Sequence, residues 1–485
     1  MVIGGGINGA AIAHLAARSG ASVALVEKND WASGTSSKST KLLHGGIRYL
    51  ENFEFDLVAE SLKERFIQYK SVPHLVKPLQ FIIPVYAHEG RPLWMMKLGV
   101  WLYDALSGCY SFGAHQALTK EEVIAQAPGI RTEGLRGGVS YFDAQMDDAR
   151  IVLENVLMAR ASGAETANYV EVESFLKEGR RIVGARLRDG HSKEQFDVMA
   201  DKIIVAAGPW TDQMKKLDNA KELRRLRPTK GVHIICRGSL RQAFLLQNKK
   251  DNRVFFAIPF KGNTLIGTTD TDFKEHADSL NVTDQEIDYL LNQAAEIFPE
   301  AHYDRESIID VFAGIRPLAY ELGSPSKVSR KHVIEKTASG RYYIYGGKYT
   351  TYRAMALECV HKVLGLRVKG LPKGDEYQLY GSGLKAVDIK NVSLQYGMEA
   401  RAIDYLIDCY GSRFDDVLQL IKKDASLKGA LCSCSLAIRA QVVYAKQVEM
   451  ARTPEDIYER RLSLVYNDCP TKQCKKTIED MFNQY

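Results

Sequence analysis

Six residues near the start of the chain have the types and spacing needed to bind a pyrophosphate. Residues 4–9 read Gly-Gly-Gly-Ile-Asn-Gly, which fits the pattern G-x-G-x-x-G, and Glu27 follows 23 residues after Gly4. Gly4 permits a tight turn, Gly6 lets the anion approach the backbone, and Gly9 lets a helix pack on a strand. Glu27 can then hold ribose hydroxyls. The pattern, which includes Asn8, predicts a dinucleotide site; it does not separate NAD from FAD, and a glycine turn without a ligand is the alternative.

The elements that must hold this turn are those of a βαβ unit. Residues 1–28 are predicted to form a strand, the glycine turn, a helix and a second strand, whose apolar run Ser22–Val26 ends at Glu27. Only three residues precede Gly4, whereas a buried strand usually has about five or six. We therefore expect a short first strand with no targeting peptide before it.

Further along the chain, apolar patterns predict a mixed sheet followed by a helical tail. The predicted helices and strands are a helix over Asp148–Ser162, a strand meander over residues 167–188, a buried strand over 202–207, the strands Val232–Cys236, Val254–Ile258 and Thr264–Gly267, and a helix over Asp284–Ile297. Glycines and a proline in residues 367–383 favour a linker, after which the pattern is helical. These patterns predict an α/β chain, in which a Rossmann-like domain is interleaved with a mixed β-sheet substrate domain and followed by a C-terminal helical domain.

Composition limits the classes of function. The 485 residues are 45% hydrophobic and 26% charged, and the net charge of +6 is too mild to indicate nucleic acid as a partner. No apolar run is long enough to span a bilayer. The eight cysteines include the pair Cys432-x-Cys434 and the later Cys469 and Cys474, but these spacings miss the usual zinc patterns. We therefore expect free thiols in a reducing cytoplasm and no metal.

Several longer motifs resemble those of one enzyme family. Residues 35–51 read Thr-Ser-Ser-Lys-Ser-Thr-Lys-Leu-Leu-His-Gly-Gly-Ile-Arg-Tyr-Leu-Glu, a stretch that resembles the signature of the FAD-dependent, quinone-linked glycerol-3-phosphate dehydrogenases. Further matches are Lys230–His233, Ile266–Asp270, Gly314–Leu318 and Gly346–Arg353. The small residues Ala13, Ala17 and Gly20 after the glycine turn, and Ala206-Ala207-Gly208 at a strand end, resemble the wider amino-acid-oxidase superfamily.

The resemblance implies FAD as the cofactor and a particular division of the chain. FAD-binding parts are expected at about residues 1–75, 142–212 and 305–366, with substrate parts at about 76–141 and 213–304. A linker at 367–383 and a helical domain at 384–485 complete the division. The residues expected to bind FAD are Gly4, Gly6, Asn8, Gly9, Glu27, Thr35, Ser36, Ser37, Lys41, His44, Gly45, Gly46, Ala207, Gly208, Gly347, Lys348 and Thr350.

The resemblance also implies oxidation of sn-glycerol 3-phosphate to dihydroxyacetone phosphate. Arginine and lysine bind a phosphate dianion well; by resemblance, Arg316 holds the phosphate, Arg48 and Tyr49 lie beside the flavin, and Lys348 lies where substrate meets it. His233 is expected to take the hydroxyl proton, because imidazole titrates near neutral pH. The alternative for an apolar-flanked histidine is a hydrogen-bonded core residue.

The electron acceptor depends on the segment Trp94–Leu102. Trp94, Leu98 and Trp101, with Leu102, share one helical face, and Arg91 and Lys97 lie near them. This pattern suits an interfacial helix on an anionic membrane that admits a quinone, and a buried amphipathic helix equally well. We expect a cytoplasmic enzyme, peripherally bound to the inner face of the cell membrane.

Other functions remain open at this point. The alternatives are an oxygen-using glycerol-3-phosphate oxidase, an amine or amino-acid oxidase on the same fold, and a flavin-binding module without turnover. No calcium-binding loop of the type D-x-[DN]-x-[DN]-G occurs, which indicates a prokaryotic rather than a mitochondrial type. A homodimer is a further alternative.

Overall fold

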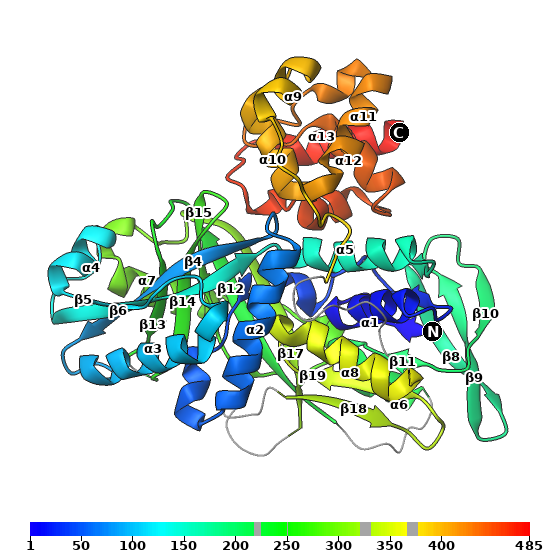
Figure 1. Cartoon of the computed structure of the whole chain (residues 1–485), viewed down its shortest axis with the longest axis horizontal. Helices are drawn as coiled ribbons and strands as arrows, with labels where there is room; N and C mark the ends of the chain where they lie inside the picture. Colours follow the sequence, from blue (N-terminus) through cyan, green and yellow to red (C-terminus); the bar gives the residue numbers. More distant parts are fainter. Residues whose placement is uncertain (218–224, 250, 321–330, 366–376) are drawn as a thin grey trace.

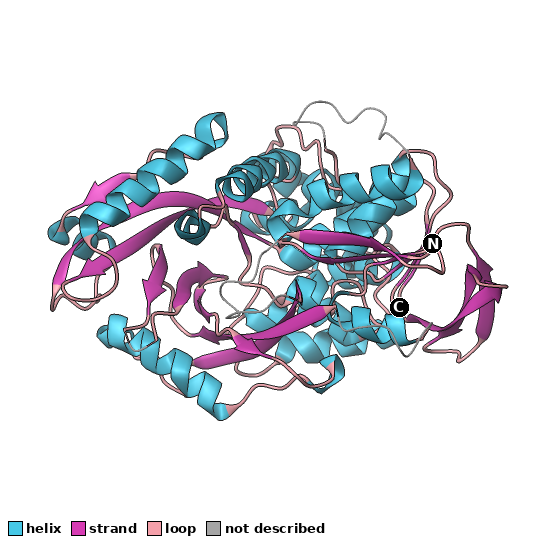
Figure 2. Ribbon diagram, turned by 90° about the horizontal axis from the view of Figure 1, so that it is seen from below, coloured by secondary structure: helices cyan, strands magenta, loops and turns pink. Residues whose placement is uncertain are grey.

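The computed structural model describes residues 1–217, 225–249, 251–320, 331–365 and 377–485. Two sheet regions lie side by side, and a helical domain formed by the last hundred residues covers one side of them (Figure 1). The view in Figure 2 shows the two sheet regions as separate groups of strands, with helices on their outer faces. The predicted fold class is confirmed.

A six-stranded sheet holds the glycine turn. Its strands, in spatial order, are β18 (His332–Lys336), β19 (Tyr342–Gly346), β11 (Ile204–Val205), β1 (Val2–Ile3), β2 (Ala24–Val26) and β7 (Glu165–Ala167). All neighbours are parallel except β18 and β19. β1 lies in the middle of the sheet, so the turn that follows it opens at the carboxyl edge, where nucleotides bind in folds of this kind.

The two faces of this sheet are covered differently. Helices α1 (Ile7–Arg18), α5 (Asp148–Ala161) and α8 (Tyr352–Leu364) form one apolar core with Val2 and Leu25. On the other face, Ile3 and Val26 pack against the three-stranded sheet of β8 (Val170–Glu178), β9 (Arg181–Asp189) and β10 (Gln195–Met199). Adjacent residues of a strand point to opposite faces, so even the short β1 contributes to both cores.

A ten-stranded sheet forms the second region. Its strands are β3 (Leu42–Leu43), β4 (Val76–Tyr86), β5 (Gln116–Leu118), β6 (Leu135–Met146), β12 (Leu226–Cys236), β13 (Ala243–Gln247), β14 (Val254–Phe260), β15 (Asn263–Gly267), β16 (Thr271–Asp272) and β17 (Ile308–Ala319). Helices α4 (Lys120–Gln126) and α7 (Asp284–Ile297) cover one face. Helices α2 (Phe55–Ser71) and α3 (Leu93–Ser107) pack on the other, together with Tyr49. A further short helix, α6 (Thr211–Lys216), follows β11.

The predicted domain boundaries can be compared with these sheets. The strands of the six-stranded sheet fall within the ranges expected for the FAD-binding parts. β17 lies in the same expected range, 305–366, but pairs along its whole length with β12 of the ten-stranded sheet. Of the expected linker, residues 367–376 lie outside the described residues. The part that is described packs on the FAD-binding region, since the buried Tyr377 hydroxyl donates a hydrogen bond to Asn155 over 2.5 Å.

The C-terminal domain has its own core and is fixed to the rest of the chain by buried charges. Its helices are α9 (Ile389–Tyr396), α10 (Ala400–Tyr410), α11 (Phe414–Lys423), α12 (Arg439–Gln447) and α13 (Gln473–Gln484). Arg461 donates to both carboxylate oxygens of Asp30, over 2.6 and 2.7 Å, and Arg460 donates to one of them over 2.7 Å. Arg150 of α5 and Glu449 form a second buried ion pair. Of the helices in the described part of the chain, none has the length and apolar character that a bilayer crossing requires.

The expectation of free thiols is wrong for two cysteines. Cys432 and Cys474 form a disulfide, and Cys434 and Cys469 lie beside it. The spacing along the chain gave no sign of this, because α13 packs against α12 and brings together two segments that are far apart in sequence.

Candidate active site

A cavity of about 550 Å³ lies at the carboxyl edge of the six-stranded sheet. Ten of the predicted site residues line it: Gly4, Gly6, Asn8, Glu27, Thr35, Ser36, Ala207, Gly208, Gly347 and Lys348. They come from the ends of β1, β2, β11 and β19, from the start of α1 and from residues 35–36. The topology of the sheet therefore brings residues from distant parts of the sequence to the wall of one cavity.

The chemistry of this cavity fits a dinucleotide. Gly6 precedes α1 and provides no side-chain cap, so the N-terminus of this helix presents backbone N–H groups toward an anion. The Ile7 N–H already donates to Ser36 Oγ over 2.9 Å, which holds residues 35–37 against the turn. Gly4 has φ +109° and its Cβ would lie 2.9 Å from the carbonyl carbon of Ala206. Only glycine fits there, and the turn can pass close to β11.

Glu27 is held at the end of β2. Its Oε2 accepts a hydrogen bond from the Gly5 N–H over 2.6 Å, and its Oε1 accepts one from the Asn29 N–H over 2.9 Å. Burial raises the pKa of Glu27. The carboxylate is thereby oriented at the cavity wall, where a ribose hydroxyl would meet it.

A second cavity, of about 260 Å³, joins the first. Thr35, Ser39, Pro317, Gly347, Lys348 and Tyr349 line both cavities. The predicted residues in the second cavity are Thr35, His44, Gly46, Arg48, Tyr49, His233, Arg316, Gly347, Lys348 and Thr350. All five predicted catalytic residues are therefore brought together, and their cavity opens onto the one that suits the cofactor.

Strand alternation places two of these residues on one face of the ten-stranded sheet. In β12, Val232 and Ile234 enter the core under α7, whereas His233 points to the opposite face. β17 runs antiparallel to β12, with Arg316 opposite Thr229 and Gly314 opposite Gly231. The Arg316 guanidinium crosses over Gly231, where a Cβ would lie 2.8 Å from its Cζ. Gly231 is therefore required for this position of Arg316.

His233 is buried and fixed on two sides. Its Nε2 lies 2.9 Å from Thr40 Oγ1, and its ring stacks on Phe312 with centroids 4.9 Å apart. Burial lowers the pKa of His233 well below its usual value, and the positive charges of Arg316 and Lys41 lower it further. The imidazole is therefore neutral at physiological pH. Its Nδ1 is buried and has no hydrogen-bond partner among the described residues.

Arg316 is oriented by its neighbours at the end of β15. Its Nη1 donates to Asp270 over 3.1 Å, and its Nη2 donates to Thr268 Oγ1 over 2.8 Å. The side chain keeps about a quarter of its surface exposed, toward the second cavity. Asp270 thus orients the guanidinium group of Arg316, which can still present N–H groups to an anion.

Lys348 lies where the two cavities meet. Its Nζ donates to Ser61 Oγ over 2.8 Å and to the Gly45 carbonyl over 3.2 Å, and it lies 4.6 Å from the centre of the Tyr49 ring. Gly46, with φ +83°, turns the chain so that Tyr49 packs against it. Arg48 also lines the second cavity.

Four predicted cofactor residues line neither cavity. Gly9 packs α1 against the turn, as expected from its position in the motif. Lys41 Nζ forms a buried ion pair with Asp148 over 2.7 Å, and Gly45 N–H donates to Tyr103 and Asp143. Ser37 is buried beneath the cofactor cavity wall and its carbonyl accepts from Lys41. These residues position the loop that carries Ser36 and His44; contact with the cofactor remains a prediction for them.

Sequence reasoning missed some residues in the second cavity. Thr40, which contacts His233, lies inside the 35–51 signature but was not singled out, and Asp270 closes the Ile266–Asp270 motif. Their membership of these motifs was the available signal. Tyr141 and Phe256 also line the cavity, from β6 and β14, and nothing in their local sequence marks them.

Known families and proteins are similar to this chain over most of its length. The family described as FAD dependent oxidoreductase matches residues 1–352, and the C-terminal domain of alpha-glycerophosphate oxidase matches residues 373–484. The aerobic glycerol-3-phosphate dehydrogenase of Staphylococcus aureus (strain USA300) is 36% identical over 96% of this chain and 86% of its own length.

Solved structures extend the comparison. The glycerol-3-phosphate dehydrogenase of Bacillus halodurans, solved with FAD, gives a TM-score of 0.80 at 30% identity, over 100% of this chain and 90% of its own. Glycine oxidase from Geobacillus kaustophilus, at 18% identity, gives 0.54 over 76% of this chain and 94% of its own, and so shares the fold. The chain therefore belongs to the FAD-dependent oxidoreductases, in the family of the aerobic glycerol-3-phosphate dehydrogenases.

Proposed function

We propose that this protein oxidises sn-glycerol 3-phosphate to dihydroxyacetone phosphate and passes the electrons to a membrane quinone. The main support for the oxidation of glycerol 3-phosphate is the second cavity. It combines a neutral buried histidine, an oriented arginine and a lysine beside the cofactor cavity. The S. aureus and B. halodurans relatives named above are glycerol-3-phosphate dehydrogenases, which supports this substrate over an amine or amino acid.

The side chains divide the chemistry between them. FAD, when bound, supplies the acceptor for the hydride from C2. Arg316 binds the phosphate dianion through charge-assisted hydrogen bonds, and Asp270 keeps its fork at a fixed angle. His233 takes the proton of the C2 hydroxyl; being neutral, it has one unprotonated ring nitrogen that can accept it. Lys348 adds positive charge at the junction of the two cavities, where negative charge develops during oxidation.

The surface proposed to receive the electron acceptor is an exposed apolar face of α3. Trp94 is 64% exposed, and Leu98 and Trp101 are each 54% exposed. The described side chains leave this face exposed, which argues against a helix buried within the chain as the explanation of the pattern. Phe53 and Met95 are exposed in the same region, and Lys97 lies exposed beside them. Tryptophan beside lysine is typical of helices that lie in the membrane interface.

A third cavity lies between this surface and the substrate cavity. It has a volume of about 460 Å³ and is lined by Trp94, Met95 and Leu98 of α3. Ile47, Arg48, Leu245 and Val254 line both this cavity and the second one. An apolar ring that entered from a bilayer would therefore be separated from the substrate cavity by only this thin wall. This arrangement favours a quinone over oxygen, which needs no such entrance.

The oxidation of glycerol 3-phosphate is tested under anaerobic conditions. Purified protein with bound FAD is mixed with sn-glycerol 3-phosphate, and the flavin absorbance is followed by stopped flow. Bleaching by this substrate, and no bleaching by glycine or sarcosine, is expected. The absence of bleaching by glycerol 3-phosphate would refute the substrate assignment.

The acceptor is tested on vesicles. Trp94→Glu with Trp101→Glu should abolish co-flotation with phosphatidylglycerol vesicles and the reduction of vesicle-embedded quinone, but leave flavin bleaching intact. Leu394→Glu is the matched control, because Leu394 is 83% exposed but lies on α9 of the C-terminal domain. Quinone reduction at the same rate in both variants, or rapid turnover with oxygen alone, would overturn the membrane and quinone proposal.

A further inference from the structure

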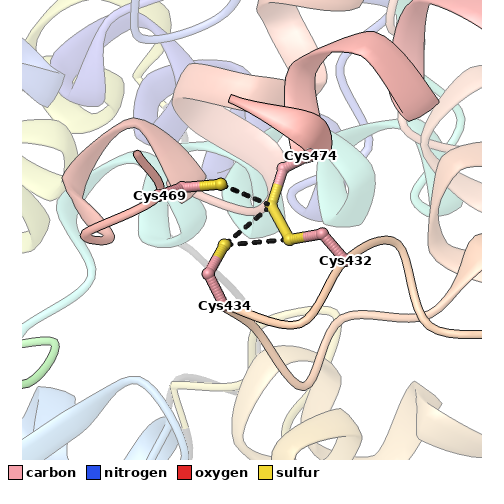
Figure 3. Close-up of side chains that lie close together, drawn as sticks. All are labelled: Cys432, Cys434, Cys469 and Cys474. Atoms are coloured by element: carbon pink, nitrogen blue, oxygen red, sulfur yellow. Dashed lines mark hydrogen bonds between the residues drawn. A yellow bond between two sulfur atoms is a disulfide. The ribbon is translucent and has the colours of Figure 1, made fainter. Parts of the chain in front are cut away.

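Four cysteines of the C-terminal domain gather at one point. Cys432 and Cys434 lie in the loop before α12, whereas Cys469 and Cys474 lie at the start of α13 (Figure 3). Their four sulfur atoms all lie within 4.8 Å of one another. Cys434 Sγ lies 2.9 Å from Cys432 Sγ and 3.0 Å from Cys474 Sγ, and Cys469 Sγ lies 3.9 Å from Cys474 Sγ.

A cluster of this size suits a single metal ion. Four thiolates around one tetrahedral ion at about 2.3 Å place their sulfur atoms about 3.8 Å apart. The observed spread can reach this geometry through small side-chain rotations, because each cysteine already points to the common centre (Figure 3). A cluster with more than one metal would need its two pairs of sulfur atoms farther apart. Four sulfur donors in tetrahedral array select zinc among common divalent ions.

The surroundings favour the thiolate form at one end of the cluster, whereas burial raises the pKa of the Cys434 thiol, so that its thiolate depends on the metal. Cys474 is fully buried in the first turn of the twelve-residue helix α13, whose N-terminus stabilises negative charge. The other three cysteines are half-buried, and all four pack against the core of the C-terminal domain. The four cysteines are therefore mostly shielded from solvent, but a metal ion can still reach them.

We propose that, when its thiols are reduced, this cluster binds one Zn²⁺ through Cys432, Cys434, Cys469 and Cys474. The ion joins the loop before α12 to the start of α13 and so closes the end of the domain. Loading requires the Cys432–Cys474 disulfide in its dithiol form, which a thiol reductant produces by exchange, taking up the oxidising equivalents itself. Zinc then displaces the thiol protons, and no other bond changes.

The site would also support the wall of the active site. Between the two cysteine segments and the substrate region lies Tyr466, whose ring centre is 5.7 Å from that of Phe312. Phe312 stacks on His233. Asn467, the next residue, donates a hydrogen bond to the Cys434 carbonyl over 3.4 Å. Loss of the ion should therefore loosen the segment that backs the catalytic histidine.

The test uses the full chain, purified with reductant and without chelator. Mass spectrometry of the metal content should find about one zinc per chain. Replacement by Co²⁺ should give the visible bands of a tetrahedral tetrathiolate site. Cys434→Ser and Cys469→Ser should each lower the zinc content at least tenfold, and Cys109→Ser is the matched control, since Cys109 is an exposed cysteine outside the cluster.

Flavin content and circular dichroism establish that each variant is folded. A zinc content below a tenth per chain in reduced protein, even after incubation with Zn²⁺, would overturn the proposal. So would iron in place of zinc, or a Cys432–Cys474 disulfide that persists in reductant. None of these readouts uses glycerol 3-phosphate, so they are independent of the function proposed above.

Discussion

Replacing Gly267 by alanine tests how β15 positions His233, the proposed catalytic base. Gly267 lies opposite His233 in the register between β12 and β15, directly against the imidazole. A Cβ on this residue would lie 2.8 Å from His233 Cγ and 3.1 Å from Nε2, and closer still to Cδ2. Ordinary contacts of this kind begin at 3.4 Å. The ring must therefore retreat, toward Phe312 and away from its present position beside Thr40.

The size of the effect follows from this displacement. Restoring normal contacts requires a shift of the ring by roughly 1 Å, and a misplacement of that size costs about 100-fold in rate, or about 2.7 kcal/mol in activation free energy. The loss of stability should be smaller, about 1–3 kcal/mol for one extra methyl group in a packed site. FAD should stay bound, because the first cavity contains neither residue.

Stopped-flow reduction of the flavin gives the rate directly. Gly429→Ala is the matched control, since a Cβ there would be 3.4 Å from its nearest neighbours and the backbone is extended, with φ −62°. If Gly267→Ala acts through the base, its effect should vanish in a His233→Ala background, whose own rate should be about 10²–10⁴-fold lower. A Gly267→Ala protein that reduces its flavin at the normal rate would refute the assignment of His233, and full additivity with His233→Ala would refute the coupling.

Three further predictions concern charges. Arg316→Ala should raise the KM for glycerol 3-phosphate by roughly 10²-fold with normal FAD content, because about 2–3 kcal/mol of charge-assisted hydrogen bonding is lost; an unchanged KM would exclude Arg316 from the phosphate site. Because the pKa of His233 is well below 6.5, the rate of flavin reduction at saturating substrate should stay level as the pH falls through 6.5, and a decline centred near 6.5 would contradict this environment. Asp30→Asn should lower the free energy of unfolding by about 3–5 kcal/mol, since two buried arginines lose their counter-charge. Burial opposes ionisation of Asp30, but Arg461 and Arg460 outweigh this effect and lower its pKa. The stabilisation by the Asp30 carboxylate is therefore fully present above about pH 3.9 and is lost as the pH falls through the pKa of the folded state. Chemical denaturation at pH 7 and pH 3 measures the difference in the free energy of unfolding.

Features set by short stretches of sequence could be predicted. The glycine turn, Glu27 and the strand before it depend on one βαβ unit, and helix α7 has the bounds expected from its apolar periodicity. Each of the five residues predicted to be catalytic lies in a motif, although the convergence of His233 and Arg316 depends on the register of β12, β15 and β17. That register follows from long-range pairing, which a single sequence does not reveal.

Features that depend on distant partners could not be predicted. Lys41 lies in the signature and carries a charge that could bind an anion. Its ammonium instead forms an ion pair with Asp148, which is more than a hundred residues away in the sequence. The four cysteines have spacings that match no simple zinc motif, and only the packing of α13 on α12 brings them together. Whether α3 is buried or exposed likewise depends on which elements cover it, and its periodicity is the same in both cases.

Under the proposed function, Arg48 lies between the spaces for two partners, one of which dissolves in water and the other in the bilayer. Glycerol 3-phosphate is a small dianion that enters from water, whereas a quinone arrives from the bilayer. Ile47, Arg48, Leu245 and Val254 border both cavities. Beside them, Gly46 turns the chain and Tyr49 contacts Lys348 on the substrate side. In the proposed function, this shared wall would keep the phosphate away from the apolar surface of the third cavity and leave a short path for electrons. Changes on α3 should therefore alter the oxidation of reduced flavin alone, and changes in β12 or β17 its reduction alone.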